Sequence, residues 1–360
     1  MSTTNGSKHG SNGKAAAGPV RTAIVGLGRA GWNIHARALR TLPELFALEL
    51  VTDPDSGRLD EARAAFGCRA ASRFEDVVDD PDVELVVVAS PSHLHTHHTI
   101  SALAAGKHVV CEKPFALDVE SADRMIAAHR THGRVLAPFQ NRRYESHYRK
   151  VVELIGSGVL GEVLLIRMCW HRFTRRWDWQ TLKEFGGGAL YNNGTHLLDQ
   201  ALAMLGPRGP DVFVDLRRGL SLGDADEHMK LVLRDPDGPT VDIEFTNACA
   251  YEQDRWHIMG TNGGLRGTTD RLEWKSAEWS AMPERRLELG PARGRRYPNE
   301  EIAWRVGSWE PDPSEPQPYE LLYRDVFGAI RRGEPLTVTP ESARRYVDIL
   351  DRCSALAAAH

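Results

Sequence analysis

Short apolar runs alternate with stretches of helical periodicity between Arg21 and Phe139. Such alternation is typical of a parallel sheet whose strands are joined by crossover helices. The run from 84 to 89 is apolar nearly throughout, as expected for a strand covered by helices on both faces. We therefore predict an α/β, doubly wound parallel sheet whose strands carry the segments TAIVG, ALELVTD, CRAAS, ELVVVAS, KHVVCE and RVLAPF.

The hydrophobic pattern changes after Arg143. It predicts a helix over 144–155, a strand over 163–170 and a long helix over 189–205. Four strand-like segments follow, VFVDLRRG, HMKLVLRD, TVDIEFTNACAY and RWHIMG. The dipeptides Asp237-Gly238 and Asn262-Gly263 are strong hairpin turn signals, so we predict a C-terminal α/β domain with a large, mostly antiparallel open sheet. No order is predicted for 270–318, and two helices, 319–331 and 340–358, are expected to close the chain.

A chain of 360 residues exceeds the usual size of one hydrophobic core, which favours two domains. We predict a disordered leader over 1–20, which is polar and rich in Gly and Ser, a first domain over 21–141 and a second domain over 142–360.

Charge, hydropathy and cysteine content limit the classes of partner and the cellular compartment that we expect. The net charge of −4 provides no basic field for nucleic acid, and no apolar run approaches the length of a membrane span, so neither nucleic acid nor membrane is expected as a partner. The five cysteines lie far apart with no CxxC pair, which fits a reducing cytoplasm better than a disulfide framework or a zinc ribbon.

The segment GLGRAG joins the first predicted strand to a helical stretch. Gly26, Gly28 and Gly31, with Arg29 and Ala30 between them, match the GxGxxG fingerprint of a Rossmann dinucleotide-binding domain. Glycines allow a tight turn and close approach of the backbone to a pyrophosphate, and the helix N-terminus offers unpaired N–H groups to the anion. The motif alone is weak evidence, but the strand–turn–helix context supports it.

Asp53 ends the second predicted strand, where an acidic residue can accept hydrogen bonds from the adenosine ribose. Its carboxylate would repel a 2′-phosphate, so NAD is favoured over NADP. The alternative is that Asp53 caps the helix that begins at Pro54. Arg58 leaves a weaker case for NADP.

Several segments, in order, resemble the glucose-fructose oxidoreductase / inositol dehydrogenase (Gfo/Idh/MocA) family. They are GLGRAGWNIHARAL, ASPSHLH, AGKHVVCEKPFAL, QNRRY and GGGALYNNGTHLLD. The resemblance runs from about Arg21 to the C-terminus. It implies a Rossmann domain, a second domain whose open sheet forms a homo-oligomer (dimer or tetramer), and a substrate cleft between the two domains.

The resemblance also implies roles for particular residues. Lys113 would belong to an EKP motif in which the lysine reaches towards the reacting hydroxyl and the Lys-Pro bond is often cis. The residues implied to approach the cofactor are Ser90, Pro91, His93, His95, Glu112, Lys113, Gln140 and Asn141, and Arg142 would contact the substrate.

Hydride transfer to or from nicotinamide leaves one proton to be handled at the substrate oxygen. Lys113 and His196 are the two candidates for this role. His196 lies four residues after Asn192, so the two side chains should share a helical face. Many family members have aspartate where this chain has Asn192, which leaves open whether His196 or Lys113 is the main proton acceptor. Asp199 is as well explained by a helix-face polar contact as by catalysis.

The segment before this helix is rich in Arg and Trp, which suits a sugar-like ligand, although packing in a surface loop explains it about equally well. Arg172, Trp179 and Tyr191 are the candidates for substrate contact. Four histidines, His93, His95, His97 and His98, resemble a metal cluster, but they lack a convincing carboxylate or cysteine partner. No metal is expected.

These observations predict an NAD(P)-dependent oxidoreductase acting on a secondary alcohol or ketone carbon of a sugar, cyclitol or glycoside. Two alternatives stay open: a glycosidase that retains NAD and acts by transient oxidation and elimination, and a non-catalytic NAD-binding protein.

Overall fold

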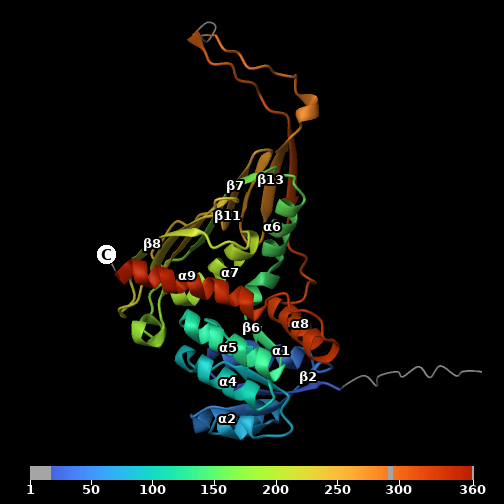
Figure 1. Cartoon of the computed structure of the whole chain (residues 1–360), viewed down its shortest axis with the longest axis vertical. Coiled ribbons are helices and arrows are strands. Elements are labelled where there is room, and N and C mark those ends of the chain that lie inside the picture. Colours follow the sequence, from blue (N-terminus) through green and yellow to red (C-terminus); the bar gives the residue numbers. More distant parts are fainter. Residues whose placement is uncertain (1–17, 291–294, 359–360) are drawn as a thin grey trace, which may run out of the picture.

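The structure is a computed structural model that describes residues 18–290 and 295–358. Two sheets lie one above the other along the long axis of the molecule (Figure 1). Most of the predicted leader falls on residues 1–17, which lie outside the described residues, and strand β1 already begins at Val20.

The first sheet has six parallel strands in the order β3-β2-β1-β4-β5-β6, so the predicted Rossmann sheet is confirmed. Successive side chains of a strand point to opposite faces, and both faces of this sheet are buried. In β1, Ala23 and Val25 enter one core while Ile24 enters the other. The strands are β1 (Val20–Val25), β2 (Phe46–Thr52), β3 (Arg69–Ala71), β4 (Leu85–Val88), β5 (His108–Cys111) and β6 (Leu136–Pro138).

Helices cover both faces of this sheet, as doubly wound topology requires. One face packs against α1 (Arg37–Thr41) and α2 (Ser56–Phe66). The other packs against α3 (Glu75–Val78), α4 (His95–Ala104) and α5 (Val119–His132). Helix α1 continues a π-helical segment, η1 (Gly31–Ala36), which follows the glycine turn.

The second sheet has eight strands in the order β14-β13-β12-β11-β7-β10-β9-β8. Only the β7–β10 pair is parallel, so the predicted mostly antiparallel sheet is confirmed. The two predicted hairpins join β9 to β10 and β11 to β12. The strands are β7 (Val163–His171), β8 (Asp211–Arg217), β9 (His228–Arg234), β10 (Thr240–Thr246), β11 (Trp256–Gly260), β12 (Gly263–Gly267), β13 (Leu272–Ala277) and β14 (Trp304–Trp309).

The segment for which no order was predicted contributes the last two strands of this sheet. Between β13 and β14 the chain makes a long excursion that projects away from the rest of the molecule (Figure 1). Leu287, Leu289 and Tyr297 on this excursion are almost fully exposed. Because these apolar side chains are exposed, the excursion has no buried face that a hydrophobic periodicity could show.

Three helices, α6 (Ser146–Gly156), α7 (Thr195–Met204) and α9 (Pro340–Ala358), pack on one face of the second sheet. Helix α9 also contacts α5, so the cores of the two domains are continuous. Charged side chains of the opposite face point away from these helices and pair across strands: Arg167 and Lys230 both pair with Asp242, and Lys230 also pairs with Glu244.

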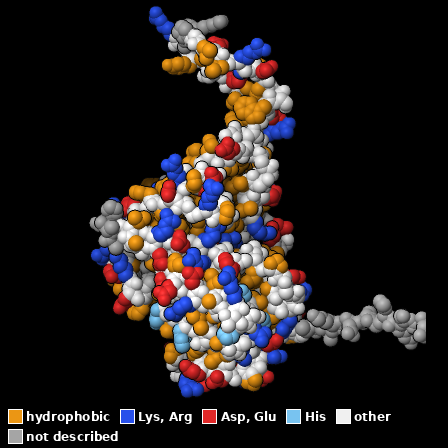
Figure 2. All heavy atoms as spheres, viewed as in Figure 1, with side chains coloured by type: hydrophobic (Ala, Val, Ile, Leu, Met, Phe, Trp, Pro, Cys, Tyr) orange, Lys and Arg blue, Asp and Glu red, His pale blue; other side chains and the backbone are white. Residues whose placement is uncertain are grey.

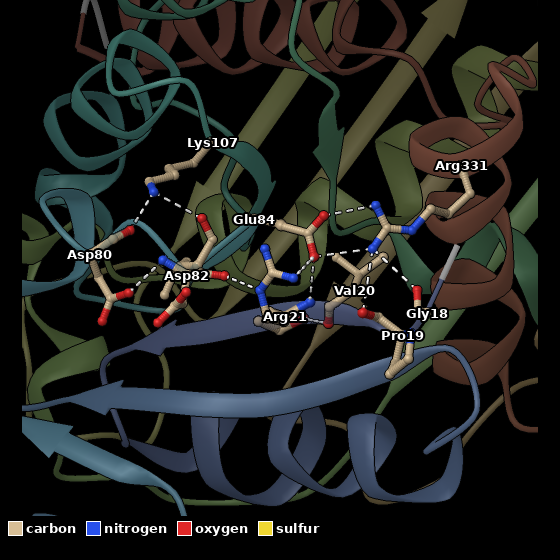
Figure 3. A network of polar contacts seen from close by, with 11 residues as sticks. Gly18, Pro19, Val20, Arg21, Asp80, Asp82, Glu84, Lys107 and Arg331 are labelled. Carbon is tan, nitrogen blue, oxygen red and sulfur yellow. Dashed lines mark hydrogen bonds and ion pairs between the residues drawn. The ribbon is translucent and has the colours of Figure 1, made fainter. Parts of the chain in front are cut away.

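Helix α8 (Pro318–Arg332) packs on the first domain, although the predicted boundary assigned it to the second. Its Leu322, Tyr323 and Val326 join the core around Ile24 and Phe46. The last turn of α8 is bound to the first domain by a polar network at the amino ends of β1, β4 and β5 (Figure 3). There Arg331 pairs with Glu84 at 2.8 Å and donates to the carbonyls of Gly18 and Pro19.

Basic and acidic side chains are interspersed on the face that Figure 2 shows, so this face carries no extended patch of one charge. Among the described residues, no helix combines the length and the apolar character that crossing a membrane would require.

Candidate active site

A cavity of about 780 Å³ opens at the carboxyl ends of β1, β2, β4 and β5, where the second domain faces the Rossmann sheet. This is the place where open α/β sheets bind ligands. Predicted site residues that line it are Gly26, Gly28, Arg29, Ala30, Asp53, Ser90, Pro91, His95, Glu112, Lys113, Asn141, Arg142, Trp179, Asn192 and His196. Five others do not line it: Gly31, His93, Gln140, Arg172 and Tyr191.

Glycine occupies each of the three positions of the turn for a different physical reason. Gly26 has φ +94°, a conformation that L side chains rarely adopt. A Cβ at Gly31 would lie 1.9 Å from the carbonyl oxygen of Gly26, so glycine is required for packing. A Cβ at Gly28 would meet nothing within 4 Å, although Gly28 lines the cavity. This open side is the space that a pyrophosphate needs to approach the backbone, so the turn fits a dinucleotide.

The buried Asp53 carboxylate accepts hydrogen bonds from the backbone N–H of Leu27 at 2.7 Å and of Asp55 at 3.0 Å. Arg58 lies 3.4 Å from it and also lines the cavity. The alternative that Asp53 caps the following helix is wrong, because Asp55 is the N-cap of α2 and accepts from Gly57 and Arg58. Asp53 thus joins the glycine turn to the end of β2.

Lys113 Nζ donates to Asn192 Oδ1 at 2.6 Å and contacts the Asn192 carbonyl oxygen at 3.3 Å. The Lys113–Pro114 peptide bond is cis. Burial and the positive charges of Arg29, Arg142 and Arg176 lower the pKa of Lys113 to about 8, although Glu112 opposes this shift. A lysine with such a pKa exchanges its proton readily near neutral pH.

His196 is buried at the start of α7, and its Nδ1 lies 2.8 Å from Gln140 Oε1. Because an amide oxygen can only accept, Nδ1 carries the proton and Nε2 keeps its lone pair. Burial, with the charges of Arg142 and Lys113, holds the pKa of His196 well below its usual value. The imidazole is therefore neutral and can accept a hydrogen bond from a ligand.

Asn192 and His196, which were expected to share a helical face, bond to different partners. Asn192 lies in a π-helical turn, η6 (Leu190–Gly194), and its amide bonds Lys113 and Gln180, whereas Gln140 orients the histidine. Gln140 was expected beside the cofactor, and its observed partner is His196. Asp199 forms a bidentate ion pair with Arg143 at 2.6 and 3.1 Å and does not line the cavity, which matches the helix-contact interpretation.

Two lining residues were expected to touch the cofactor but are occupied within the protein. The Glu112 carboxylate accepts from His35 Nε2 at 3.2 Å and from the Lys113 backbone N–H at 2.9 Å. The two ring nitrogens of His95 lie 2.8 Å from the Pro114 carbonyl oxygen and 2.9 Å from the Ser90 carbonyl oxygen. Both side chains hold the loops that follow β4 and β5.

The substrate side of the cavity differs from the prediction at two positions. Tyr191 was expected to donate to the substrate, but its hydroxyl is 2.9 Å from Ser354 Oγ on α9. Arg172 was expected in the cleft, but its guanidinium lies over the Trp170 ring, 4.8 Å from the centroid. Tyr191 is therefore held by a partner that lies far away in the sequence, whereas Arg172 packs on a ring two residues before it.

Several cavity residues were not among the predicted site residues. Arg176 lines the cavity and pairs with Asp178 at 2.7 Å and with Gln180 Oε1 at 2.8 Å. The Arg- and Trp-rich composition pointed to this segment but could not tell which arginine faces inward. The other missed lining residues include Ser72, Phe74, His98 and Asn193, which carry no motif signal.

The four histidines after β4 have different surroundings. His93 and His97 are exposed, while His98 stacks on Phe74 and its Nδ1 lies 2.9 Å from Ser90 Oγ. No group of three or more His, Cys, Asp or Glu arranged to hold a metal occurs within 18–290 and 295–358.

Comparison with known proteins assigns both domains. Residues 20–139 match the oxidoreductase family with an NAD-binding Rossmann fold, and residues 148–266 match the GFO/IDH/MocA C-terminal domain. Scyllo-inositol 2-dehydrogenase (NADP(+)) IolW of Bacillus subtilis is 27% identical over 92% of each chain.

A second relative, D-glucoside 3-dehydrogenase of Escherichia coli, is 37% identical over 52% of this chain and 54% of its own length. The crystal structure of GenD2 from gentamicin A biosynthesis, in complex with NAD, superposes with a TM-score of 0.77 and 26% identity, and the match covers 99% of this chain and 97% of GenD2. With both domains matched and the glycine turn and the EKP lysine at one cavity, the chain belongs to the Gfo/Idh/MocA family of NAD-binding oxidoreductases.

Proposed function

We propose that the protein is an NAD-dependent dehydrogenase that oxidises a secondary alcohol of a sugar, cyclitol or glycoside, or runs this reaction in reverse. The observation that carries the proposal is the position of Lys113, which lies in the same cavity as Gly28 and has a pKa near 8. When bound, nicotinamide supplies the hydride acceptor at C4. Lys113 Nζ would take the proton of the reacting hydroxyl.

Lys113, rather than His196, is the main proton acceptor in this proposal. Burial and the cationic surroundings of His196 disfavour an imidazolium, so the neutral histidine accepts a hydrogen bond from a second hydroxyl of the substrate and orients the sugar ring. Lys113 can release its hydrogen bond to Asn192 and bind the substrate oxygen instead.

NAD is preferred over NADP because the Asp53 carboxylate lies at the adenosine end of the cavity beside the glycine turn. The preference is moderate, since Arg58 would attract a 2′-phosphate and the relative IolW is named for NADP.

A polyhydroxylated substrate suits the second-domain side of the cavity. The face of Trp179 can stack on a sugar ring, and Arg142 and Arg176 present guanidinium donors to its oxygens. The names of the two relatives, an inositol dehydrogenase and a glucoside dehydrogenase, support the same class.

The test is a panel of sugars, inositols and glycosides with NAD or NADP, followed at the absorbance of reduced nicotinamide. We expect net NADH formation by the native enzyme and loss of at least about a hundredfold in kcat for Lys113→Ala. Glycoside cleavage without NADH accumulation would instead indicate the redox glycosidase. Dinucleotide binding without turnover of any substrate would indicate a non-catalytic protein.

We also propose that copies associate through the open face of the second sheet and that the protein works in the cytoplasm. A partner would bury the exposed apolar side chains of this face, such as Phe213 on β8, Met259 on β11 and Val306 on β14. All five cysteines are free thiols, which suits a reducing compartment. Light scattering should give a dimer or tetramer, and cell fractionation should recover the protein in the cytosol.

A further inference from the structure

A chain of buried hydrogen bonds leads from helix α8 to the loop that carries Lys113. The Tyr323 hydroxyl lies 2.8 Å from His35 Nδ1, and His35 Nε2 lies 3.2 Å from Glu112 Oε1. The other Glu112 oxygen accepts the backbone N–H of Lys113 at 2.9 Å. The side chains of Tyr323 and His35 are fully buried.

The direction of each hydrogen bond follows from the chemistry of the groups. A carboxylate can only accept, so His35 Nε2 donates to Glu112. His35 Nδ1 then accepts from the Tyr323 hydroxyl, which stays protonated because burial raises the pKa of Tyr323 well above its usual value. Burial opposes ionisation of Glu112, but the hydrogen bond from His35, together with the charge and the backbone N–H of Lys113, outweighs burial and lowers the pKa of this carboxyl.

Glu112 is also the one acidic group among those that shift the pKa of Lys113. Facing Lys113 are Arg29 from the glycine turn, Arg142 and Arg176 from the second domain, His95 after β4 and the neutral His196 on α7. All of the charged groups except Glu112 disfavour the protonated amine. The anionic state of Glu112 therefore helps the lysine to hold its proton, against burial and the neighbouring positive charges.

We propose that Tyr323, His35 and Glu112 form a positioning chain that keeps an anion beside Lys113 and so sets the position and the proton affinity of this lysine. The inference rests on the proposed role of Lys113 in proton transfer. It also gives helix α8 a role in the site: the helix returns to the first domain and supplies the hydroxyl that completes the chain.

Three variants test the proposal. Glu112→Gln removes the charge, and Tyr323→Phe removes only the hydroxyl that holds His35. Tyr144→Phe is the matched control, because the buried Tyr144 hydroxyl also anchors α8, but its hydrogen bond goes to Asp325 at 2.6 Å and not to Tyr323, His35 or Glu112.

The proton affinity of Lys113 is read without substrate, by competitive acetylation with acetic anhydride across a pH series and mass spectrometry of the Lys113 peptide. We expect Glu112→Gln to lower the labelling midpoint by about one pH unit and Tyr323→Phe to lower it by less. Tyr144→Phe should reduce thermal stability as Tyr323→Phe does, but leave the midpoint in place.

The pH dependence of kcat/KM for oxidation is then compared with the labelling. The acidic limb of this profile should move to lower pH together with the labelling midpoint, because the Lys113 amine then loses its proton at lower pH. An unmoved labelling midpoint in both Glu112→Gln and Tyr323→Phe would overturn the positioning chain. A midpoint that moves while the limb stays would support the chain and overturn the proposed role of Lys113 as proton acceptor. If Glu112→Gln does not fold, Tyr323→Phe against Tyr144→Phe decides the question.

Discussion

Asn192 shows how one side chain changes meaning when its neighbours are known. From the sequence it was a neutral substitute for a carboxylate that would support His196. In the structure its amide oxygen accepts from Lys113, and its amide group donates to Gln180 at 3.2 Å. The residue therefore acts on the lysine, and a charge placed at this position would act there too.

We expect Asn192→Asp to move the acidic limb of the kcat/KM profile for oxidation to higher pH by about one unit or more. A carboxylate beside Lys113 favours the ammonium form, so the amine becomes available as a base only at higher pH. The profile is measured with saturating NAD over a pH series.

Asn262→Asp is the matched control, because Asn262 lies in the hairpin between β11 and β12 and bonds Val159 and Trp279 instead of the cavity residues. It makes the same chemical change and should leave the limb in place. An acidic limb that stays in place in Asn192→Asp would show that Lys113 is not the essential base of the enzyme–NAD complex.

At the scale of elements, both segments that carry the site begin with a π-helical turn. One is η1 after the glycine turn, and the other is η6 before His196. Such turns are rare and occur often at functional sites, because they reset the direction of side chains within a helix. The glycine turn also separates packing from binding, since only some of its glycines are required by the protein's own atoms.

Gly31→Ala and Gly28→Ala should therefore fail in different ways. The Cβ of the first would collide with the Gly26 carbonyl, so we expect a large loss of thermal stability. The Cβ of the second enters open space, so we expect a melting temperature close to that of the native protein. Its dissociation constant for NAD in calorimetry should rise at least about tenfold, because the methyl group occupies the space for the pyrophosphate.

Gly133→Ala serves as a control for backbone strain. Gly133 has φ +60° at the end of α5, and a Cβ there would meet nothing within 4 Å. We expect lower stability with unchanged NAD affinity. Equal NAD affinity in Gly28→Ala and the native protein would contradict the assignment of this turn as the pyrophosphate site.

At the scale of the whole molecule, the chain does not divide at one point into two domains. Helix α9 packs against both sheets' layers, and α8 completes the core of the first domain. Arg331 on α8 joins the last helical segments to the first strand through Glu84 and the carbonyls of Gly18 and Pro19 (Figure 3). These contacts join the C-terminal helices to the N-terminal domain, so we expect them to stabilise it.

We expect Arg331→Ala to lower the free energy of unfolding by about 1–3 kcal/mol at neutral pH, because it removes the nearer cation of the partly buried Glu84 carboxylate and leaves only Arg21 at 3.6 Å. Burial raises the pKa of Glu84, but the hydrogen bond from Arg331 and neighbouring donors lower it overall. A depressed folded-state pKa stabilises the fold above the unfolded value and loses this effect as the pH falls through it.

The difference between Arg331→Ala and the native protein should therefore shrink below about pH 4. Denaturant titrations followed by circular dichroism at neutral and acidic pH measure it. Arg332→Ala is the control, because Arg332 is exposed and pairs locally with Glu334. The denaturation midpoint of this variant should equal that of the native protein. A destabilisation that is equal at both pH values would assign the effect of Arg331→Ala to lost packing.

Local patterns predicted much of the molecule. Apolar runs located the strands of the Rossmann sheet, and two turn dipeptides located hairpins of the second sheet, because both signals depend on neighbouring residues only. The same holds for Gly26, Gly28 and Lys113, whose motifs are contiguous in sequence. The excursion between β13 and β14 carried no such pattern and was not predicted.

Only the tertiary structure decided which partner each polar side chain takes. Gln140 orients His196, Asn192 binds Lys113, Arg176 rather than Arg172 faces the cavity, and Tyr191 turns to Ser354. Each of these contacts except the Arg176 position joins residues more than fifty positions apart. Periodicity determines which face of an element is buried, whereas a hydrogen bond between elements depends on how those elements pack, and that depends on the whole chain.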